Sequence, residues 1–462
     1  MPFATIRTQR SSLAWAGLGL AGSVLVALAG PQLAGGPVKW WFDPSLGAAL
    51  FYAGIVALGV AWLALGRLAV TTREVWVVAA AWCLPLLLTA PLFSQDAYSY
   101  LAQGTIVHLG LDPYRDAPAV LAAHGHAHVL NAVSPFWRHT TAPYGPLFLW
   151  IVSWFSGSSL VVGVLLIRAV ELIGFVLLAV FVPRLARDLG ADPARATWLV
   201  LLSPLLLLEL VAAAHNDLLM IGLVVAGISL AIERRVLVGI ALCALAATIK
   251  LPAAVAIPFI LVAFSTDRKT LVRGVLVAAG VVVAVSLVSG LGLGWLSTSV
   301  FSTPGKVRLA ITPATAVGWT LAQVVPVGAR GLESAFGVVA FGLAVALGVA
   351  LLWRARRETM VRYLGIVLVV AAVAGPASWP WYLSWGLVLL AACPEIQDSR
   401  WLVLVLAAGP LVVKADGILA FPLHTAPVFV VLYLGAGVLW FARRRPAAAG
   451  SKRWRTRALV ES

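Results

Sequence analysis

The chain has 462 residues, of which 61% are hydrophobic and only 11% are charged. These proportions exclude an ordinary soluble domain and are typical of a polytopic membrane protein. The formal net charge is +15, but the basic residues gather in short segments between apolar runs, as the positive-inside rule describes for cytoplasmic loops. The charge therefore indicates membrane topology, and we expect no nucleic-acid partner.

Apolar runs recur along the whole chain and predict an all-α fold with about 12–14 transmembrane helices. With the N-terminus and the basic clusters inside, the runs give spans near residues 13–34, 46–66, 75–93, 161–183, 196–214, 217–232, 236–249, 252–264, 274–292, 332–353, 362–375, 383–393, 401–414 and 422–442. The gaps between the runs are short, so we expect one integral membrane domain over residues 1–462. Its basic tail, at about 443–462, is predicted to be cytoplasmic.

Three apolar segments need separate treatment. Residues 145–156 and 313–327 are short, and counting either as a span would invert the basic clusters after it, so we expect helices on the outer surface. Residues 13–29 could be a secretory signal, but the run is long for one, and a retained anchor is favoured. The cysteines lie inside apolar runs and predict neither a disulfide nor a zinc site; they are Cys83, Cys243 and Cys393.

The first large external loop, at about 94–145, begins with an acid. Asp96 follows the apolar run 75–93 within three residues, which places it at a membrane surface. Apolar residues at helical spacing predict an amphipathic helix from Asp96 to Gly110 that lies on the membrane. A carboxylate at the start of a helix either caps exposed N–H groups or acts as a general base. The local sequence leaves both roles open.

The predicted outer face holds most of the remaining titratable groups. All seven histidines and four acids fall on it: His108, His124, His126, His128, His139, His215, His424, Asp96, Asp112, Asp116 and Asp217. A site is therefore expected outside, close to lipid. The tract 124–128 has histidine at alternate positions, as some metal sites do, but it contains glycine and lacks nearby carboxylates. A mobile loop is favoured there, and we expect no metal or other cofactor.

Five short motifs, in a fixed order along most of the chain, resemble those of one enzyme family. They are Asp96-Ala97-Tyr98-Ser99-Tyr100 with Gly104, Gly110-Leu111-Asp112-Pro113-Tyr114, Pro143-Tyr144-Gly145-Pro146-Leu147, His215-Asn216-Asp217 and Ser378-Trp379-Pro380-Trp381-Tyr382. Together they resemble the actinobacterial polyprenol-phosphomannose-dependent alpha-1,6-mannosyltransferases. That family belongs to the GT-C class of membrane glycosyltransferases.

The resemblance implies a GT-C-like bundle in the cytoplasmic membrane with its active site on the external side. It implies transfer of mannose, with inversion, from a polyprenyl-phosphate-mannose donor to a lipid-linked mannan acceptor through an alpha-1,6 linkage. Such products belong to lipomannan and lipoarabinomannan of the cell envelope. The expected partners are these two substrates and membrane lipids. The family's catalytic base is an acid in the first external loop, and Asp96 matches that position.

A lipid phosphate that leaves needs positive charge at the outer membrane boundary. Lys250 is the leading candidate, because it is a lone cation at the break before Pro252 in an apolar hairpin. A lysine that snorkels to the interface is the alternative. Arg115 is a second donor-phosphate candidate, and Lys306 and Arg308 are others.

Sugar and acceptor binding is expected from the polar and aromatic residues of the motifs: Tyr100, Asp112, Tyr114, Tyr144, His215, Asn216, Asp217, Trp379, Trp381 and Tyr382. Two of these groups have structural alternatives. Residues 215–217 could form a turn and helix cap, and residues 379–382 could belong to the aromatic belt of the membrane interface.

Two acids inside apolar runs, Glu171 and Glu209, support a different class of protein, because carboxylates within the membrane often mark ion paths in transporters. Transporters are commonly built from repeated halves, and the sequence shows no internal repeat. A glycosyltransferase is therefore favoured. A secondary transporter or flippase of a lipid-linked sugar is the alternative, and a scaffold without catalysis is a third hypothesis.

Overall fold

The computed structural model describes residues 2–34, 43–297, 308–309, 311–375 and 378–444. Within these ranges the regular structure is helical, and the β pairing is an isolated bridge between Val413 and Leu419. The prediction of an all-α polytopic fold is therefore confirmed. Residues 445–462, most of the predicted basic tail, lie outside the described residues.

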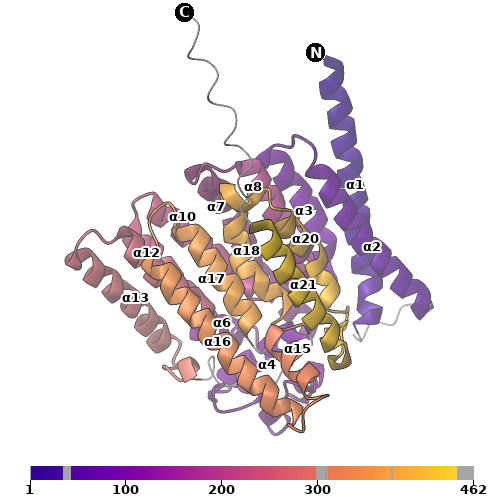
Figure 1. The fold of residues 1–462 in the computed structure, drawn as a ribbon. Helices are drawn as coiled ribbons and strands as arrows, with labels where there is room; N and C mark the ends of the chain where they lie inside the picture. Colours follow the sequence, from indigo (N-terminus) through magenta and orange to yellow (C-terminus); the bar gives the residue numbers. More distant parts are fainter. Residues whose placement is uncertain (1, 35–42, 298–307, 310, 376–377, 445–462) are drawn as a thin grey trace, which may run out of the picture.

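The N-terminal part is a helical hairpin and a third helix, followed by the loop 94–145 and the centre of the bundle (Figure 1). The first three helices are α1 (Pro2–Leu33), α2 (Pro44–Leu65) and α3 (Thr72–Leu88). The loop contains α4 (Asp96–His108), η1 (Pro118–Ala122), α5 (Ala127–Ala132) and α6 (Pro146–Ser153). The bundle continues with α7 (Leu160–Asp188), α8 (Pro193–Leu201), α9 (Pro204–Leu206), η2 (Leu207–Ala212), α10 (Asp217–Ile232) and α11 (Val236–Ala247).

The C-terminal part covers one side of this bundle. After the break at Lys250 come η3 (Leu251–Val255), α12 (Ala256–Phe264) and α13 (Arg268–Val288). The remaining elements are α15 (Pro313–Leu321), α16 (Ala329–Trp353), α17 (Met360–Ala374), η4 (Pro380–Leu383), α18 (Ser384–Ala391), α19 (Pro394–Gln397), α20 (Arg400–Ala408), η5 (Gly409–Val412), η6 (Leu423–Thr425) and α21 (Ala426–Arg444).

Five helices are long and apolar enough to cross a membrane alone: Ser11–Leu33 of α1, α2, α7, α13 and α16. The bent pair Pro193–Leu201 and Pro204–Ala212 is a sixth candidate. Seven further apolar helices of 10–17 residues, among them α10, α11 and α17, occupy other predicted spans. The chain is thus a multi-pass membrane protein whose inner helices are shorter than its outer ones.

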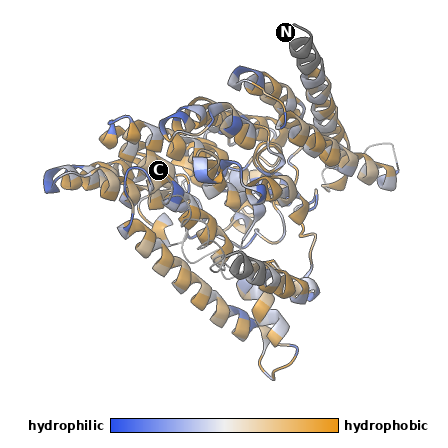
Figure 2. Cartoon of the chain, turned by 45° about the horizontal axis from the view of Figure 1, so that its top comes forward, coloured by the Kyte–Doolittle hydropathy of each residue, from blue (hydrophilic) through white to orange (hydrophobic). Residues whose placement is uncertain are grey.

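The outer helices present apolar side chains to their surroundings. In α16 none of the most apolar 18-residue window is buried, and in α13 the buried share is 11%. Val338 and Phe341 of α16 are examples of large exposed hydrophobic residues. Figure 2 shows hydrophobic residues along the helices and hydrophilic residues mainly in loops and at helix ends. Such a surface is stable against lipid and not against water.

The third helix ends five residues earlier than its apolar run. It begins with a capping box between Thr71 and Glu74 and ends at Leu88. Pro91 follows closely, and a proline disfavours helix in the residue before it. Phe93 then adopts a left-handed φ of 63°. The chain is therefore not helical between Leu88 and Asp96.

The helix predicted after Asp96 is confirmed as α4, and Gly110 follows its end with a φ of 74°. The prediction that this helix lies on the membrane is wrong, because α5, α6, α7 and η1 pack on α4 and bury it along most of its length. Gly104 allows the close crossing with α6, since a Cβ there would lie 2.6 Å from the carbonyl oxygen of Val152. In Figure 1, α4 and α15 lie at one end of the bundle and the start of α1 lies at the other.

Candidate active site

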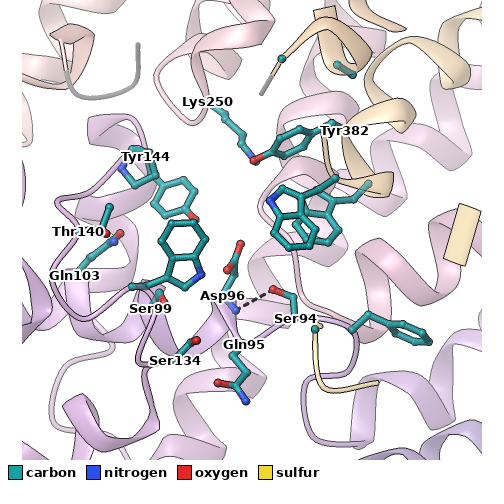
Figure 3. Close-up of a pocket in the computed structure, with 18 of the residues that line it drawn as sticks. Ser94, Gln95, Asp96, Ser99, Gln103, Ser134, Thr140, Tyr144, Lys250 and Tyr382 are labelled. Carbon is teal, nitrogen blue, oxygen red and sulfur yellow. Dashed lines mark hydrogen bonds between the residues drawn. The ribbon is translucent and has the colours of Figure 1, made fainter. Parts of the chain in front are cut away.

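A cavity of about 500 Å³ lies where the loop 94–145 meets the second half of the bundle (Figure 3). Six residues that the sequence predicts separately line it together: Asp96, Tyr144, Lys250, Trp379, Trp381 and Tyr382. They come from segments that are far apart in the chain, including the start of α4, the approach to α6 and the break after α11. An ionisable group in a concave site that also contains several aromatic rings is a candidate for catalysis.

Asp96 is the first residue of α4, and its carboxylate faces the cavity (Figure 3). Its backbone N–H donates to Ser94 Oγ at 3.1 Å. The N-cap position belongs to Gln95, and no side-chain cap bond is present at this helix start. The capping role that the sequence left open for Asp96 is therefore not the one observed.

Burial raises the pKa of the Asp96 carboxyl to about 6. The nearby positive charge of Lys250 opposes this shift, whereas the carboxylate of Asp217 adds to it. Hydrogen bonds from Ser94 and Tyr144 also favour the ionised form. A carboxylate with this pKa is ionised at neutral pH and is a stronger base than an ordinary aspartate.

His215 lies behind Asp96 and is fully buried. Its Nδ1 is 3.6 Å from Asp96 Oδ2 and 3.4 Å from the Tyr100 hydroxyl, and its ring stacks on Trp381 with centroids 4.1 Å apart. Burial, together with the charge of Lys250, lowers the pKa of His215 well below its usual value. A neutral imidazole therefore supports Asp96 without cancelling its charge.

Lys250 and Asp217 form the central ion pair of the site. The Lys250 ammonium donates to both carboxylate oxygens of Asp217, at 3.0 and 2.8 Å. Trp385 Nε1 donates to Asp217 Oδ1 at 2.5 Å, and the Lys250 Nζ lies 4.7 Å from the ring centroid of Tyr382. The lysine is 9% exposed, so its head group is held inside the protein and does not snorkel to water.

Backbone bonds before α6 bring Tyr144 beside this pair. The Gly145 N–H donates to the Ile249 carbonyl at 2.8 Å, and the Leu147 N–H donates to the Thr248 carbonyl at 3.0 Å. A Cβ at Gly145 would lie 2.1 Å from the Thr248 oxygen. Only glycine fits this approach, which joins the end of the loop 94–145 to the break that carries Lys250.

Arg168 ties together the two segments that lead into the site. Its guanidinium donates to the carbonyls of Leu87 at 2.9 Å, of Ala212 at 2.8 Å and of Thr89. These acceptors lie at the end of α3, before Asp96, and at the end of η2, before His215. Five N–H donors in a rigid fork allow one arginine to satisfy several carbonyls that helix ends leave free.

Glu171 and Glu209, the two acids that supported the transporter hypothesis, have different surroundings. Glu171 Oε2 accepts a hydrogen bond from the Leu219 N–H at 3.0 Å, so this carboxylate satisfies the start of α10. Glu209 lies in η2, which is a π-helix, and its two carboxylate oxygens have no hydrogen-bond partner among the described residues. Neither acid lines the cavity.

Several predicted residues lie outside the cavity lining. Arg115 has an 87% exposed side chain and pairs with Asp112 at 3.4 Å, and Asp112 accepts the Tyr114 N–H at 2.9 Å. These three therefore organise a turn of the loop 94–145. Tyr100, Asn216 and Asp217 lie behind the lining, and the amide atoms of Asn216 have no partner in the described structure.

Lys306 and Arg308 were the other two candidates for binding the donor phosphate. Lys306 lies outside the described residues. Arg308 is paired with Glu333 and lines a second cavity beside the first. Among the described residues, no group of three His, Cys, Asp or Glu side chains is placed to hold a metal ion. The absence of a metal requirement stays a prediction.

The sequence also contained signals for residues that were not singled out. Ser99 and Gln103 line the cavity with Asp96, and their spacing of three and four residues puts all three on one face of α4. Trp385 stands four residues after Trp381. This helical spacing places both residues on the same side of the segment formed by η4 and α18. Trp137 lacked a comparable signal, because the loop around it has no periodic pattern.

Comparison with known protein families agrees with the earlier motifs. Residues 12–266 match the family described as "Alpha-(1->6)-mannopyranosyltransferase, N-terminal domain", a stretch that includes Asp96, His215, Asp217 and Lys250. Residues 311–443 match the MptB C-terminal domain. The chain belongs to the alpha-(1->6)-mannopyranosyltransferase family. The resemblance inferred from the motifs is thereby confirmed.

Curated members of the alpha-(1->6)-mannopyranosyltransferase family are similar over most of the chain. Alpha-(1->6)-mannopyranosyltransferase A of Mycobacterium tuberculosis is 32% identical over 458 residues, which cover 87% of this chain and 84% of the relative. Alpha-(1->6)-mannopyranosyltransferase A of Corynebacterium glutamicum is 30% identical over 393 residues, covering 78% of this chain and 79% of the relative. No solved structure matches the chain.

Proposed function

We propose that the chain is a mannosyltransferase that moves mannose from a polyprenyl-phosphate-mannose donor to a lipid-linked mannan acceptor, forming an alpha-1,6 linkage. The observation that supports this most is the Asp96 carboxylate, which faces an aromatic cavity also lined by Lys250. Membership of the family and the names of its curated members support the sugar and the linkage.

In the proposed reaction Asp96 is the general base. The acceptor's 6-hydroxyl oxygen forms a bond to the anomeric carbon, the bond from that carbon to the phosphate oxygen breaks, and polyprenyl phosphate leaves with the electron pair. Asp96 takes the hydroxyl proton. One carboxylate within hydrogen-bond reach is sufficient for this single displacement, which inverts the anomeric carbon.

Lys250 is proposed to hold the donor phosphate. An ammonium has three N–H donors, and two of them go to Asp217, which leaves one for a phosphate oxygen. Asp217 and Trp385 fix the ammonium before substrate arrives, and a preorganised cation is effective where negative charge develops. Arg115, in contrast, has an exposed side chain away from this cavity, which gives it little support as a second phosphate ligand.

The tryptophans of the motif at 378–382 are proposed to have two different roles. Trp379 is half-buried, lines the cavity and stacks on Trp381 with centroids 4.9 Å apart, so its ring is suited to pack on a sugar. Trp381 is 3% exposed and supports His215 by stacking. A membrane-belt role explains neither contact.

An outer location of the site is part of the proposal. The start of α1 and α4, with Asp96 at its beginning, lie at opposite ends of the bundle (Figure 1). If the N-terminus is inside, as the basic residues near it favour, the cavity opens outward. We also keep the proposal that residues 1–462 form one integral domain.

The test is transfer by the purified protein in lipid nanodiscs. Labelled polyprenyl-phosphate-mannose and a nucleotide-activated mannose are supplied separately with a short alpha-1,6-mannoside. We expect product from the lipid donor only, and an alpha-1,6 linkage on analysis of that product. Product from the nucleotide donor alone would overturn the donor assignment. Movement of intact lipid-linked sugar between leaflets without new linkages would favour the transporter alternative.

A further inference from the structure

A second cavity of about 960 Å³ lies beside the first. Its walls come from five places in the chain: residues 134–140 of the loop 94–145, residues 308–309, the helices α15 and α16, Trp379, and residues 416–423. Its volume is at the upper end of the range for ligand pockets, about 300–1,000 Å³. None of the reaction steps described above uses this space.

The two cavities have a wall in common. Trp137, Thr140, Trp379 and Asp416 line both of them. The loop that contributes Asp416 is anchored next to the catalytic segment, because the Phe93 N–H donates to the Ala415 carbonyl at 2.9 Å. A ligand that occupied both cavities would have one end in the cavity that Asp96 lines.

The lining of the second cavity has balanced charge. It contains two arginines, Arg308 and Arg330, and two acids, Glu333 and Asp416. Arg308 pairs with Glu333 and also donates to the Arg330 carbonyl at 3.3 Å. Among the described lining residues, a phosphate or an anionic head group would find no excess of lysine and arginine over acids, whereas a neutral ligand meets no electrostatic penalty.

The same lining combines aromatic rings with planar hydrogen-bonding groups. Trp137, Trp319 and Trp379 face the cavity, and all three are half-buried, so each has part of its surface free to contact a ligand. Tryptophan offers a large apolar face at low entropic cost. Guanidinium and carboxylate groups can bind adjacent hydroxyls in pairs. A neutral oligosaccharide matches both features, because it has sugar rings that pack on aromatic faces and adjacent hydroxyls that bind in pairs.

We propose that this second cavity binds the acceptor mannan chain beyond its terminal sugar, so that it forms extended acceptor subsites. The proposal rests on the proposed transferase function and adds the place and chemistry of acceptor binding. It explains why the site has a large polar and aromatic extension that a single mannose does not need. Acceptors long enough to fill the second cavity should bind more tightly than acceptors that reach only the first.

The experiment compares an alpha-1,6-mannotetraoside with the corresponding mannobioside. Binding of a fluorescent derivative of each is measured on the full chain in nanodiscs without donor. For the native protein we expect tighter binding of the tetraoside. In Trp319→Ala its dissociation constant should rise about tenfold, the usual effect of losing one aromatic contact, while mannobioside binding stays unchanged. Equal affinity of the two sugars for the native protein would overturn the proposal.

Two variants keep the test interpretable. Trp154→Ala removes a tryptophan that is 73% exposed and lines neither cavity, and it should bind both sugars as the native chain does. Arg330→Ala changes an exposed residue, and it should weaken the tetraoside alone even if Trp319→Ala fails to fold. Tetraoside binding that neither Trp319→Ala nor Arg330→Ala weakens would reject the subsites.

The binding measurement separates this inference from the proposed function. A chain that binds the tetraoside through Trp319 but transfers mannose from no donor would contradict the transferase and leave the subsites standing. A chain that transfers mannose equally well to both acceptors, with the same KM in Trp319→Ala, would contradict the subsites and leave the transferase standing.

Discussion

Asp96 illustrates how single residues are tuned by opposing effects. Burial disfavours its charge, while Lys250 and hydrogen bonds from Ser94 and Tyr144 favour it. Two residues with left-handed backbone, Phe93 and Ala214, stand just before the segments that provide Asp96 and His215. A non-glycine residue in this conformation costs on the order of 1–3 kcal/mol and is common at functional sites.

The pKa of about 6 for Asp96 gives a prediction for pH dependence. A base must be ionised, so activity is retained above the raised pKa and is lost as the pH falls through it. We expect kcat/KM to be level above about pH 7 and to fall about tenfold for each unit below about pH 6. Initial rates of transfer across this range, with folding checked at each pH, test this. A profile that stays level below pH 5 would exclude Asp96 as the titrating base.

The ion pair of Lys250 and Asp217 predicts a pattern of stability in a double-mutant cycle. Lys250→Met or Asp217→Leu alone leaves one buried charge uncompensated and should lower the free energy of unfolding by about 3–5 kcal/mol. The double variant removes both charges and should recover most of that stability without recovering transfer. Unfolding by denaturing detergent gives the stability. Additive losses in the double variant would show that the two charges do not depend on each other.

At the scale of elements, Gly145 decides whether the segment before α6 can approach the break that carries Lys250. Gly145→Ala would push a Cβ into the Thr248 carbonyl, separating Tyr144 from Lys250. We expect transfer to fall at least about tenfold. The control is Gly59→Ala in α2, where a Cβ meets nothing within 4 Å and alanine favours the helix. Transfer that survives Gly145→Ala unchanged would show that this contact is not needed to assemble the site.

The local sequence indicated which residues stand at the ends of apolar segments better than it indicated which residues contact each other in the folded chain. Asp96 and Lys250 were singled out because each is a charge next to a long apolar run, although the local sequence left capping and snorkelling open as alternatives. The ion pair of Lys250 with Asp217 and Trp385 was not predictable, since residues 217, 250 and 385 meet only after α10, α11 and α18 have packed. Arg115 matched the expected chemistry, but it lies on a turn away from the cavity because short-range bonds to Asp112 hold it there.

At the scale of the whole molecule, the lengths of apolar runs predict the helices on the outside of the bundle better than the helices at its centre. The long helices α13 and α16 face outward and read as complete spans. The central α10 has 16 residues and is buried by α7, α11 and α18, so protein replaces lipid around it and its length is not set by the bilayer. Pro204 and the π-helix η2 interrupt the neighbouring predicted span at 196–214, so this segment also forms shorter helices.

Membrane orientation can be tested with single added cysteines, because the native Cys83, Cys243 and Cys393 are buried. His128→Cys lies on the loop 94–145 and Glu358→Cys lies on the connection between α16 and α17, and both positions are exposed. With a membrane-impermeant maleimide on intact cells, we expect labelling of position 128 only. Position 358 should react after lysis. The reverse pattern would place the cavity on the cytoplasmic side.

The measurement that tests the central claim most directly is single-turnover transfer from polyprenyl-phosphate-mannose by the native chain, Asp96→Asn and Asp116→Asn. The asparagine at position 96 keeps the shape of the side chain but cannot accept the proton, while Asp116 is an acid of the same loop that lines neither cavity. We predict a loss of at least about 100-fold in the rate for Asp96→Asn, unchanged tetraoside binding, and a native rate for Asp116→Asn. Transfer by Asp96→Asn at the native rate would contradict the account.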